Sequence, residues 1–464
     1  MENISYDLVI LGAGPGGYVA AIRAAQLGLR VACVEKSQPG GTCLNRGCIP
    51  SKALLDSSEL YYQAGSSFKR HGITTGELSC DLTAMMKRKD RIVTTMNRGI
   101  QSLFKKHNIT SITGVGRLES TNSVSVETPD GATTLSAERI LLATGSMPQA
   151  LPGAPWGERI ISSTEALTLA AVPEKLLVVG AGAIGLELGS VWSRLGSEVQ
   201  VIEMLNSVMP GMDQDITAPL QKALQKQGLK FHLETRVERV QTTDSSVEIT
   251  TQNSTGTSEF SADYLLVAIG RAPCTEGLGL DTAGVELNDQ GRIPVGADFQ
   301  TNISGIYAIG DVTPGPMLAH RAEEEGIAAV ESMTGHPKLQ HATLIPGVVY
   351  TDPEAAAVGL TEAQAKEQGL NYQCGSFPFI ANGRARCLQA TDGLVKVISE
   401  TDTDRILGVH ILGPRASDLI AEAVLAMRTG ATALEVGETI HAHPTLPEVF
   451  KEAALAVHGR AIHI

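Results

Sequence analysis

Two cysteines, Cys43 and Cys48, lie close together in the stretch GGTCLNRGCIPSK, residues 40–52. Such a thiol pair can bind a metal ion, stay inert in a core, or form a redox-active disulfide. A structural zinc site needs further Cys or His ligands at short spacing, and Cys80 and Cys274 are isolated in the sequence. We therefore predict no metal site, which leaves inert thiols or a redox couple.

Backbone geometry decides whether these two sulfurs can form a bond. A disulfide needs Cα atoms within about 7 Å of one another. In a straight strand the Cα atoms of Cys43 and Cys48 would lie much farther apart than this limit, and in a regular helix they would lie slightly farther apart. A distorted first helical turn would bring the sulfurs together, and Gly47 and Pro50 are suited to distort it. Because thiols near a helix N-terminus also have a lowered pKa, these features favour a redox couple.

A candidate acid–base group lies in the stretch HAHPTLPEVFKEA, residues 441–453. His443 is followed by Glu448, whose carboxylate could orient the imidazole ring. His441 is a competing candidate in the same stretch. A histidine with only a structural role at a helix start explains the pattern equally well.

Two glycine-rich turns would position a pair of nucleotides. Residues 6–36 and 175–203 each show a short apolar strand, a glycine turn, a helix and a second strand ending in an acid. This pattern is a βαβ unit that occurs twice. Its glycines let the backbone approach a pyrophosphate at the helix N-terminus, and its acid accepts hydrogen bonds from a ribose. The residues in these roles are Gly12, Gly14, Gly17 and Glu35 in the first unit, and Gly180, Gly182, Gly185 and Glu203 in the second.

The second unit favours NAD over NADP. Glu203 would repel a 2′-phosphate, and the residues after it, MLNSVMP, contain no Lys or Arg to bind one. Two nucleotide sites suggest one flavin and one nicotinamide, and the spacing alone does not assign them. Lys52 and Glu187 lie inside motifs that should be buried. Since a buried charge needs a partner, these two side chains could pair with one another.

The rest of the sequence indicates an α/β protein with a separate C-terminal region. Each βαβ unit is followed by a strand that stops at a glycine, in ATG at residues 143–145 and in AIGRAP at residues 268–273. The stretches 148–153 and 271–277 then mark crossings between domains. From about His341 the mixture of strands and helices is typical of an α+β domain.

Composition excludes several classes of protein. The 464 residues carry a formal net charge of −13, which argues against nucleic-acid binding because phosphates need basic patches. No apolar run is long enough to span a membrane, and no targeting segment is recognisable, so we expect a cytoplasmic protein. Seven cysteines are too few, and odd in number, for a structural disulfide framework.

The order of these motifs resembles that of the flavin-dependent pyridine nucleotide–disulfide oxidoreductases. GAGPGG, GGTCLNRGCIPSK, ATG, GAGAIGLELG, AIGRAP, GIYAIGDV and HAHPTLPE follow one another as in that family, over nearly the whole chain. The resemblance implies two Rossmann-like dinucleotide-binding domains of three-layer ββα form and a C-terminal α+β dimerisation domain. The implied boundaries are 1–147 for the FAD-binding domain, 148–272 for the NAD-binding domain, 273–340 for the second part of the FAD-binding domain, and 341–464 for dimerisation.

The resemblance also implies a role for each candidate residue. Cys43 and Cys48 would form the redox disulfide, in which Cys43 exchanges with substrate and Cys48 lies against the flavin. His443, oriented by Glu448, would be the acid–base group and would come from the other subunit of a homodimer. The implied FAD contacts are Gly12, Gly14, Gly17, Glu35, Lys52, Gly116, Thr144, Gly145, Asp311 and Ala319. Lys52 would pair with Glu187 beside the flavin. The implied NAD contacts are Gly180, Gly182, Gly185, Glu203, Val237 and Gly270.

The implied reaction oxidises protein-bound dihydrolipoamide to lipoamide and passes two electrons through the disulfide and FAD to NAD+. The implied partners are a second copy of the chain and a lipoyl-bearing domain, either of a 2-oxo acid dehydrogenase complex or of the glycine cleavage carrier protein. Many relatives carry an aliphatic residue and a Ser where this chain has Arg46 and Pro447, which leaves substrate preference open.

Other readings fit the sequence less well. A mercuric reductase would be expected to end in a cysteine pair, whereas this chain ends AVHGRAIHI. A glutathione reductase would be expected to use NADP, whereas Glu203 favours NAD. A soluble pyridine nucleotide transhydrogenase would lack the cysteine pair. The alternative is a related flavin reductase that acts on a small disulfide or a metal substrate. A non-enzymatic scaffold would tolerate the loss of Cys43, Cys48 or His443, and all three are present.

Overall fold

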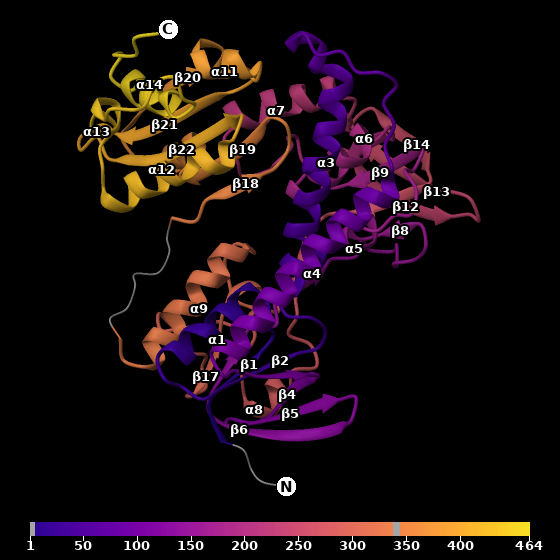
Figure 1. Ribbon diagram of the computed structural model, residues 1–464, viewed down its shortest axis with the longest axis vertical. Coiled ribbons are helices and arrows are strands. Elements are labelled where there is room, and N and C mark those ends of the chain that lie inside the picture. The colour runs from indigo at the N-terminus through magenta and orange to yellow at the C-terminus, as the bar shows by residue number, and fades with distance from the viewer. Residues whose placement is uncertain (1–4, 337–343) are drawn as a thin grey trace. The chain divides into compact units, whose positions relative to one another are not determined.

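The structure, a computed structural model, describes residues 5–336 and 344–464 (Figure 1). The chain divides into two compact units. Unit 1 comprises residues 1–53, 83–149 and 270–343, and unit 2 comprises residues 54–82, 150–269 and 344–464. The domain boundary predicted at residues 340 and 341 lies outside the described residues, and the other boundaries stay predictions.

Unit 1 is built on a seven-stranded sheet with the order β3-β2-β1-β6-β5-β4, in which β17 also pairs with β6. The pairs β1–β2, β2–β3, β1–β6 and β17–β6 are parallel, and β4, β5 and the first half of β6 form an antiparallel meander. The strands are β1 (Ser5–Leu11), β2 (Val31–Glu35), β3 (Thr110–Thr113), β4 (Val115–Ser120), β5 (Ser123–Thr128), β6 (Gly131–Leu142) and β17 (Ile306–Ala308).

Helices complete unit 1 and pack closely where glycine allows it. The helices are α1 (Pro15–Gln26), α2 (Gly41–Arg46), α4 (Leu82–Lys106), α8 (Leu280–Ala283), α9 (Ala319–Met333) and the 3₁₀ turn η2 (Gly310–Val312), while α3 (Cys48–Ser66) runs from unit 1 into unit 2. A Cβ on Gly326 of α9 would lie 2.6 Å from the Gly16 carbonyl oxygen of α1. The two helices therefore approach through their glycines, which fixes the glycine turn before α1.

The first part of unit 2 repeats the parallel design. Its five-stranded sheet has the order β11-β10-β9-β15-β8, all parallel, and a three-stranded antiparallel sheet, β12-β13-β14, follows β11 in the chain. The elements are η1 (Phe68–His71), β8 (Ile160–Ile161), α5 (Ser163–Ala166), β9 (Lys175–Val179), α6 (Ala183–Arg194), β10 (Glu198–Ile202), α7 (Gln214–Lys226), β11 (Lys230–His232), β12 (Arg236–Thr242), β13 (Val247–Asn253), β14 (Gly256–Ala262) and β15 (Tyr264–Val267). Because the β9–α6–β10 segment is a βαβ unit like β1–α1–β2, the predicted internal repeat is confirmed.

The C-terminal part of unit 2 is an antiparallel sheet, β18-β19-β22-β21-β20, with α12 and α14 packed against it. The elements are β18 (Gly347–Val349), β19 (Glu354–Gly359), α10 (Glu362–Glu367), β20 (Tyr372–Pro378), η3 (Phe379–Ala381), α11 (Gly383–Leu388), β21 (Leu394–Glu400), β22 (Ile406–Gly413), α12 (Ala416–Thr429), α13 (Ala433–Glu438) and α14 (Glu448–Ala456). An apolar core around Phe377, Val409 and Phe450 joins this sheet to its helices. The predicted α/β class with a C-terminal α+β region is confirmed.

The two predicted crossings begin side by side. β7 (Ser146–Pro148) and β16 (Arg271–Pro273) form a two-stranded antiparallel sheet in unit 1, and the Gln149 N–H donates to the Gly270 carbonyl oxygen. The chain thus leaves unit 1 after β7 and re-enters it at β16.

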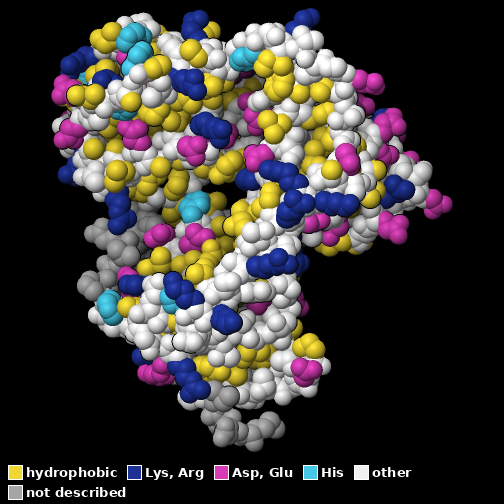
Figure 2. Space-filling model, in the orientation of Figure 1, with side chains coloured by type: hydrophobic (Ala, Val, Ile, Leu, Met, Phe, Trp, Pro, Cys, Tyr) yellow, Lys and Arg dark blue, Asp and Glu magenta, His cyan; other side chains and the backbone are white. Residues whose placement is uncertain are grey.

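Acidic and basic side chains share the face shown in Figure 2, where a run of Lys and Arg lies over α4.

Within the described ranges, no helix has the length and apolar character needed to cross a bilayer.

Candidate active site

The two cysteines lie on either side of a break between helices. α2 ends at Arg46, Gly47 adopts φ −146° and ψ −113°, and α3 begins at Cys48. We had predicted a distorted first turn of one helix; the structure instead has two helices, because the Gly47 backbone leaves the helical region. A Cβ at Gly47 would lie 2.9 Å from the Thr42 carbonyl oxygen, so this close approach requires glycine. Pro50 lies in the first turn of α3, where a missing N–H costs little.

The break brings the two thiols into contact. Both are half-buried, and the hydrogen bond with Cys48 is the largest of the causes that raise the pKa of the Cys43 thiol, followed by burial. The nearby Lys52 ammonium acts in the opposite direction and lowers that pKa. The pKa of Cys43 is thus raised and not lowered as its place near a helix N-terminus had predicted, because the neighbouring thiol and burial outweigh Lys52. The sulfurs are close together next to a positive charge, a setting that suits a reversible disulfide.

The first glycine turn forms a cradle for a phosphate group. Gly12 has φ +100°, and a Cβ there would lie 2.4 Å from the Ala143 carbonyl oxygen. A Cβ on Gly17 would lie 1.9 Å from the Gly12 carbonyl oxygen, whereas at Gly14 the nearest atom would be 3.9 Å away. Gly12 and Gly17 therefore shape the turn, while Gly14 leaves space beside the N-terminus of α1 for a pyrophosphate.

The remaining predicted FAD contacts also lie in unit 1. Glu35 accepts a hydrogen bond from the Ala13 N–H at 2.9 Å, which holds its carboxylate beside the turn. The Thr144 hydroxyl donates to the Cys274 carbonyl oxygen at 2.7 Å, and Gly145 has φ +73°. The others are Gly116, which packs on the Leu11 side chain, and Ala319, the first residue of α9.

Asp311 belongs to a network that sequence reasoning missed. Its Oδ2 accepts a hydrogen bond from the Ser146 hydroxyl at 2.5 Å. Arg271 donates from Nε to the Ser146 hydroxyl and from a terminal nitrogen to the Ser146 carbonyl oxygen, each at 2.7 Å. Burial lowers the pKa of Arg271, and the Asp311 carboxylate opposes that shift. Ser146 and Arg271 directly follow the ATG and AIG strand ends, and this shared position was the one feature of the sequence that could have indicated their contact.

The second glycine turn has the same geometry. Gly180 has φ +105°, and a Cβ on Gly185 would lie 2.1 Å from the Gly180 carbonyl oxygen, whereas a Cβ on Gly182 would meet nothing within 4 Å. Glu203 accepts hydrogen bonds from the Ala181 N–H and the Leu205 N–H, each at 2.8 Å. Its carboxylate is thus fixed at the end of β10, where a ribose would lie.

Three other predicted nucleotide contacts lie on different segments of the chain. Glu187 is buried on α6 and accepts a hydrogen bond from the Tyr350 N–H at 3.1 Å. Its predicted partner Lys52 belongs to unit 1, so that pairing stays a prediction. Val237 is half-buried on β12 and packs against the apolar core of the second sheet, and Gly270 lies in unit 1.

The two candidate histidines have different surroundings. His443 Nδ1 lies 2.9 Å from Glu448 Oε1, and 78% of the His443 side chain is exposed. Burial raises the pKa of Glu448, but hydrogen bonds from the Thr445 N–H and from His443 outweigh it, so the pKa is lowered. His441 is 6% exposed, with Nε2 2.9 Å from Glu422 and Nδ1 3.0 Å from the Thr439 carbonyl oxygen. Of the two candidates, only His443 combines an orienting carboxylate with an accessible ring.

Comparison with known proteins gives matches over almost the whole chain. Residues 6–326 match the family described as pyridine nucleotide-disulphide oxidoreductase, and residues 345–454 match its dimerisation domain. The chain is 50% identical to the mitochondrial dihydrolipoyl dehydrogenase of Pisum sativum, over 99% of this chain and 92% of that protein. It is 48% identical to dihydrolipoyl dehydrogenase 3 of Pseudomonas aeruginosa, over 99% of both chains. Among solved structures, LpdA from Mycobacterium tuberculosis matches with a TM-score of 0.89 at 28% identity, covering 96% of this chain and 98% of that one.

Proposed function

Because the chain belongs to the pyridine nucleotide-disulphide oxidoreductase family, we propose that it oxidises protein-bound dihydrolipoamide to lipoamide. The chain is an enzyme of that family, its cofactors are FAD and NAD, and it forms a homodimer through the matched dimerisation domain. The names of the curated relatives support dihydrolipoamide as the substrate.

The observation that carries this proposal is the pair of hydrogen-bonded thiols at the helix break. Cys43 and Cys48 lie in the same unit as the first glycine turn, and thiol–disulfide exchange needs two sulfurs that can bond and separate without a large backbone movement.

The proposed reaction begins with proton removal. The exposed Nε2 of His443 accepts a proton from one thiol of dihydrolipoamide, since only the thiolate attacks a disulfide. That thiolate forms a bond to the sulfur of Cys43 and breaks the Cys43–Cys48 bond, which leaves Cys48 as the thiolate. The second substrate sulfur then bonds to the first and breaks the bond between the first and Cys43. Its proton passes to the Cys43 sulfur, which leaves as a thiol, and the lipoamide ring is closed. Two electrons pass from substrate to enzyme, and Glu448 stabilises the protonated imidazole.

The cofactors supply the hydride chemistry that removes this electron pair from the enzyme when they are bound. The chain's residues bind and orient them. In the proposed FAD site, Gly14 leaves room for the pyrophosphate, Glu35 lies beside that turn, and Asp311 is held by Ser146. In the proposed NAD site, Gly182 and Glu203 have the matching roles. The domain boundaries 1–147, 148–272, 273–340 and 341–464 are proposed on the same basis.

The partner and the compartment are also proposals. The substrate thiols would reach the enzyme on a lipoyl-bearing domain, of a 2-oxo acid dehydrogenase complex or of the glycine cleavage carrier protein. The compartment is proposed to be the cytoplasm, because seven cysteines are too few, and odd in number, for the structural disulfide framework of a secreted protein.

A turnover assay on the holoenzyme tests the proposal. NADH formation would be followed with dihydrolipoamide, first free and then on a lipoyl domain, for wild type, Cys43→Ser and the control Cys374→Ser, whose cysteine is exposed elsewhere. Cys43→Ser is expected to retain FAD and to lose turnover, while the control keeps it. Turnover that survives in a flavin-loaded Cys43→Ser enzyme would exclude the disulfide mechanism.

A further inference from the structure

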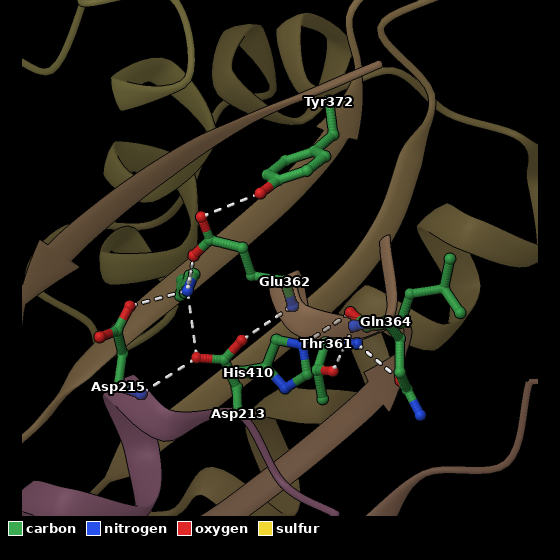
Figure 3. A network of polar contacts seen from close by, with 9 residues as sticks. Asp213, Asp215, Thr361, Glu362, Gln364, Tyr372 and His410 are labelled. Atoms are coloured by element: carbon green, nitrogen blue, oxygen red, sulfur yellow. Dashed lines mark hydrogen bonds and ion pairs between the residues drawn. The ribbon is translucent and has the colours of Figure 1, made fainter. Parts of the chain in front are cut away.

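A buried lysine joins the two parts of unit 2. Lys396 lies on β21, and its side chain is 4% exposed. Its Nζ lies 2.5 Å from Glu362 Oε2, 2.7 Å from Asp215 Oδ2 and 3.1 Å from Asp213 Oδ1. Since an unpaired buried ammonium is costly, the three carboxylates, which converge in Figure 3, are what allow it to be buried.

Asp213 is the centre of this cluster, which we call the Lys396 cluster: Lys396, Asp213, Asp215 and Glu362. Asp213 is the N-cap of α7 and is 3% exposed. Its Oδ1 accepts from the Asp215 N–H and its Oδ2 accepts from the Glu362 N–H, each at 3.0 Å. Burial raises the pKa of Asp213, but these two backbone N–H groups and Lys396 outweigh it, so the pKa is lowered. One ionised side chain therefore connects α7, α10 and β21.

The segment before Asp213, residues 204–212, runs back to the proposed NAD site. It directly follows Glu203, whose carboxylate accepts from the Ala181 N–H of the second glycine turn. The Met209 N–H donates to the Ala181 carbonyl oxygen at 2.9 Å, and Val208 is completely buried. The segment is thus attached to the glycine turn at one end and to the Lys396 cluster at the other.

Two apolar side chains of this segment are turned outward next to Glu203. Met204 is 64% exposed and Leu205 is 45% exposed. A flat adenine ring stacks well on such side chains, and the Glu203 carboxylate beside them suits the adjoining ribose.

We propose that Lys396 is a positioning residue for NAD: through Asp213 it fixes residues 204–212, and with them the surface that receives the adenosine half. The inference rests on the proposed role of Glu203 in binding NAD. A buried ion cluster is a weak source of stability, because apolar residues of similar volume often replace one without loss. The Lys396 cluster can instead serve to hold residues 204–212 in one position.

Binding of ADP-ribose to the oxidised holoenzyme tests this inference directly, because the probe carries the adenosine half and undergoes no redox reaction. Its Kd would be measured by calorimetry for wild type, Lys396→Met, Asp213→Asn and the control Lys230→Met. Lys230 forms an ion pair with Glu198 in the same parallel sheet but is 60% exposed. Because Asn can also cap the N-terminus of α7, Asp213→Asn is expected to fold. Its Kd for ADP-ribose therefore tests the inference even if Lys396→Met does not fold. Hydrogen exchange of residues 204–212 provides a second readout.

Both cluster variants are expected to weaken ADP-ribose binding at least about fivefold, the lower end of typical couplings between sites. They should also speed hydrogen exchange in residues 204–212, and Lys230→Met should match wild type. A folded cluster variant that binds ADP-ribose as tightly as wild type would overturn the inference. Failure of wild type itself to bind ADP-ribose would instead refute the proposed role of Glu203, so the two failures are distinguishable.

Discussion

At the scale of single residues, two histidines in one short segment have different capacities. His441 has a partner on each ring nitrogen and a buried side chain. His443 has its partner on Nδ1, and most of its ring is exposed. Because a general base must offer a free nitrogen to the proton that it removes, the available group is His443.

Substituting each histidine separately tests this difference. His443→Gln is expected to lower kcat by about 10²- to 10⁴-fold, the usual contribution of general acid–base catalysis, and His441→Gln is expected to lower it far less. The measurement is NADH formation from dihydrolipoamide at saturating substrates. The opposite ranking would show that His441 is the base.

His441 should nevertheless matter for stability in a pH-dependent way. Its hydrogen bond to Glu422 is the largest cause that raises its pKa, and burial opposes it. The stabilisation is therefore complete below the unfolded-state pKa of about 6.5 and is lost as the pH rises through the higher folded-state pKa. The loss of unfolding free energy in His441→Gln should be larger at about pH 5.5 than at about pH 9. An equal loss at both pH values in denaturant titrations would contradict this assignment.

Glu203 predicts the nicotinamide preference. Both of its oxygens accept backbone N–H groups, so the carboxylate is held in place and would repel a 2′-phosphate. We expect NADH to be a far better substrate than NADPH in the reverse reaction with lipoamide. Comparable kcat/KM values for the two nucleotides would refute the assignment of this site.

At the scale of elements, different glycines of one turn are needed for folding and for binding. Gly185 is needed for the turn itself, since its Cβ would lie 2.1 Å from a backbone oxygen, while Gly182 faces open space with ordinary backbone angles. The same division holds for Gly17 and Gly14 in the first turn. Two similar-looking glycines in one motif thus have different physical roles.

Alanine at these two positions should have opposite effects. Gly182→Ala is expected to keep the wild-type Tm and to weaken NAD+ binding, because the added methyl occupies the phosphate cradle. Gly185→Ala is expected to lower the Tm, because backbone atoms must move. Thermal melts and calorimetric NAD+ titrations of both holoenzymes provide the test, and a Gly182→Ala enzyme with unchanged NAD+ affinity would count against the cradle.

At the scale of the whole molecule, motifs with local causes were predictable and distant contacts were not. The βαβ units, the strand ends and the His443–Glu448 pair follow from residue spacing within short segments. The Arg271–Ser146 contact joins segments far apart in the chain, and the Lys396 cluster brings together side chains from α7, α10 and β21. Such contacts depend on how sheets are assembled, which periodicity does not reveal. The break at Gly47 was misjudged because spacing could not distinguish one distorted helix from two.

The dimer is the level at which the proposed site is complete. In the single chain two large apolar side chains of the dimerisation region are exposed, Ile440 at 93% and Ile462 at 73%. If His443 serves the cysteines of the second subunit, mixing Cys43→Ser and His443→Gln subunits should create dimers with one intact site. We expect the mixture to be clearly more active than either variant alone, and no gain after proven subunit exchange would place both residues in one subunit.

The most direct test of the whole account is a thiol alkylation experiment on the oxidised holoenzyme, read by mass spectrometry. Cys43 and Cys48 should resist alkylation at first, and both should become alkylated after one equivalent of dihydrolipoamide, while the exposed Cys387 reacts throughout. Full alkylation of Cys43 and Cys48 before any dihydrolipoamide is added would contradict a redox disulfide at this site.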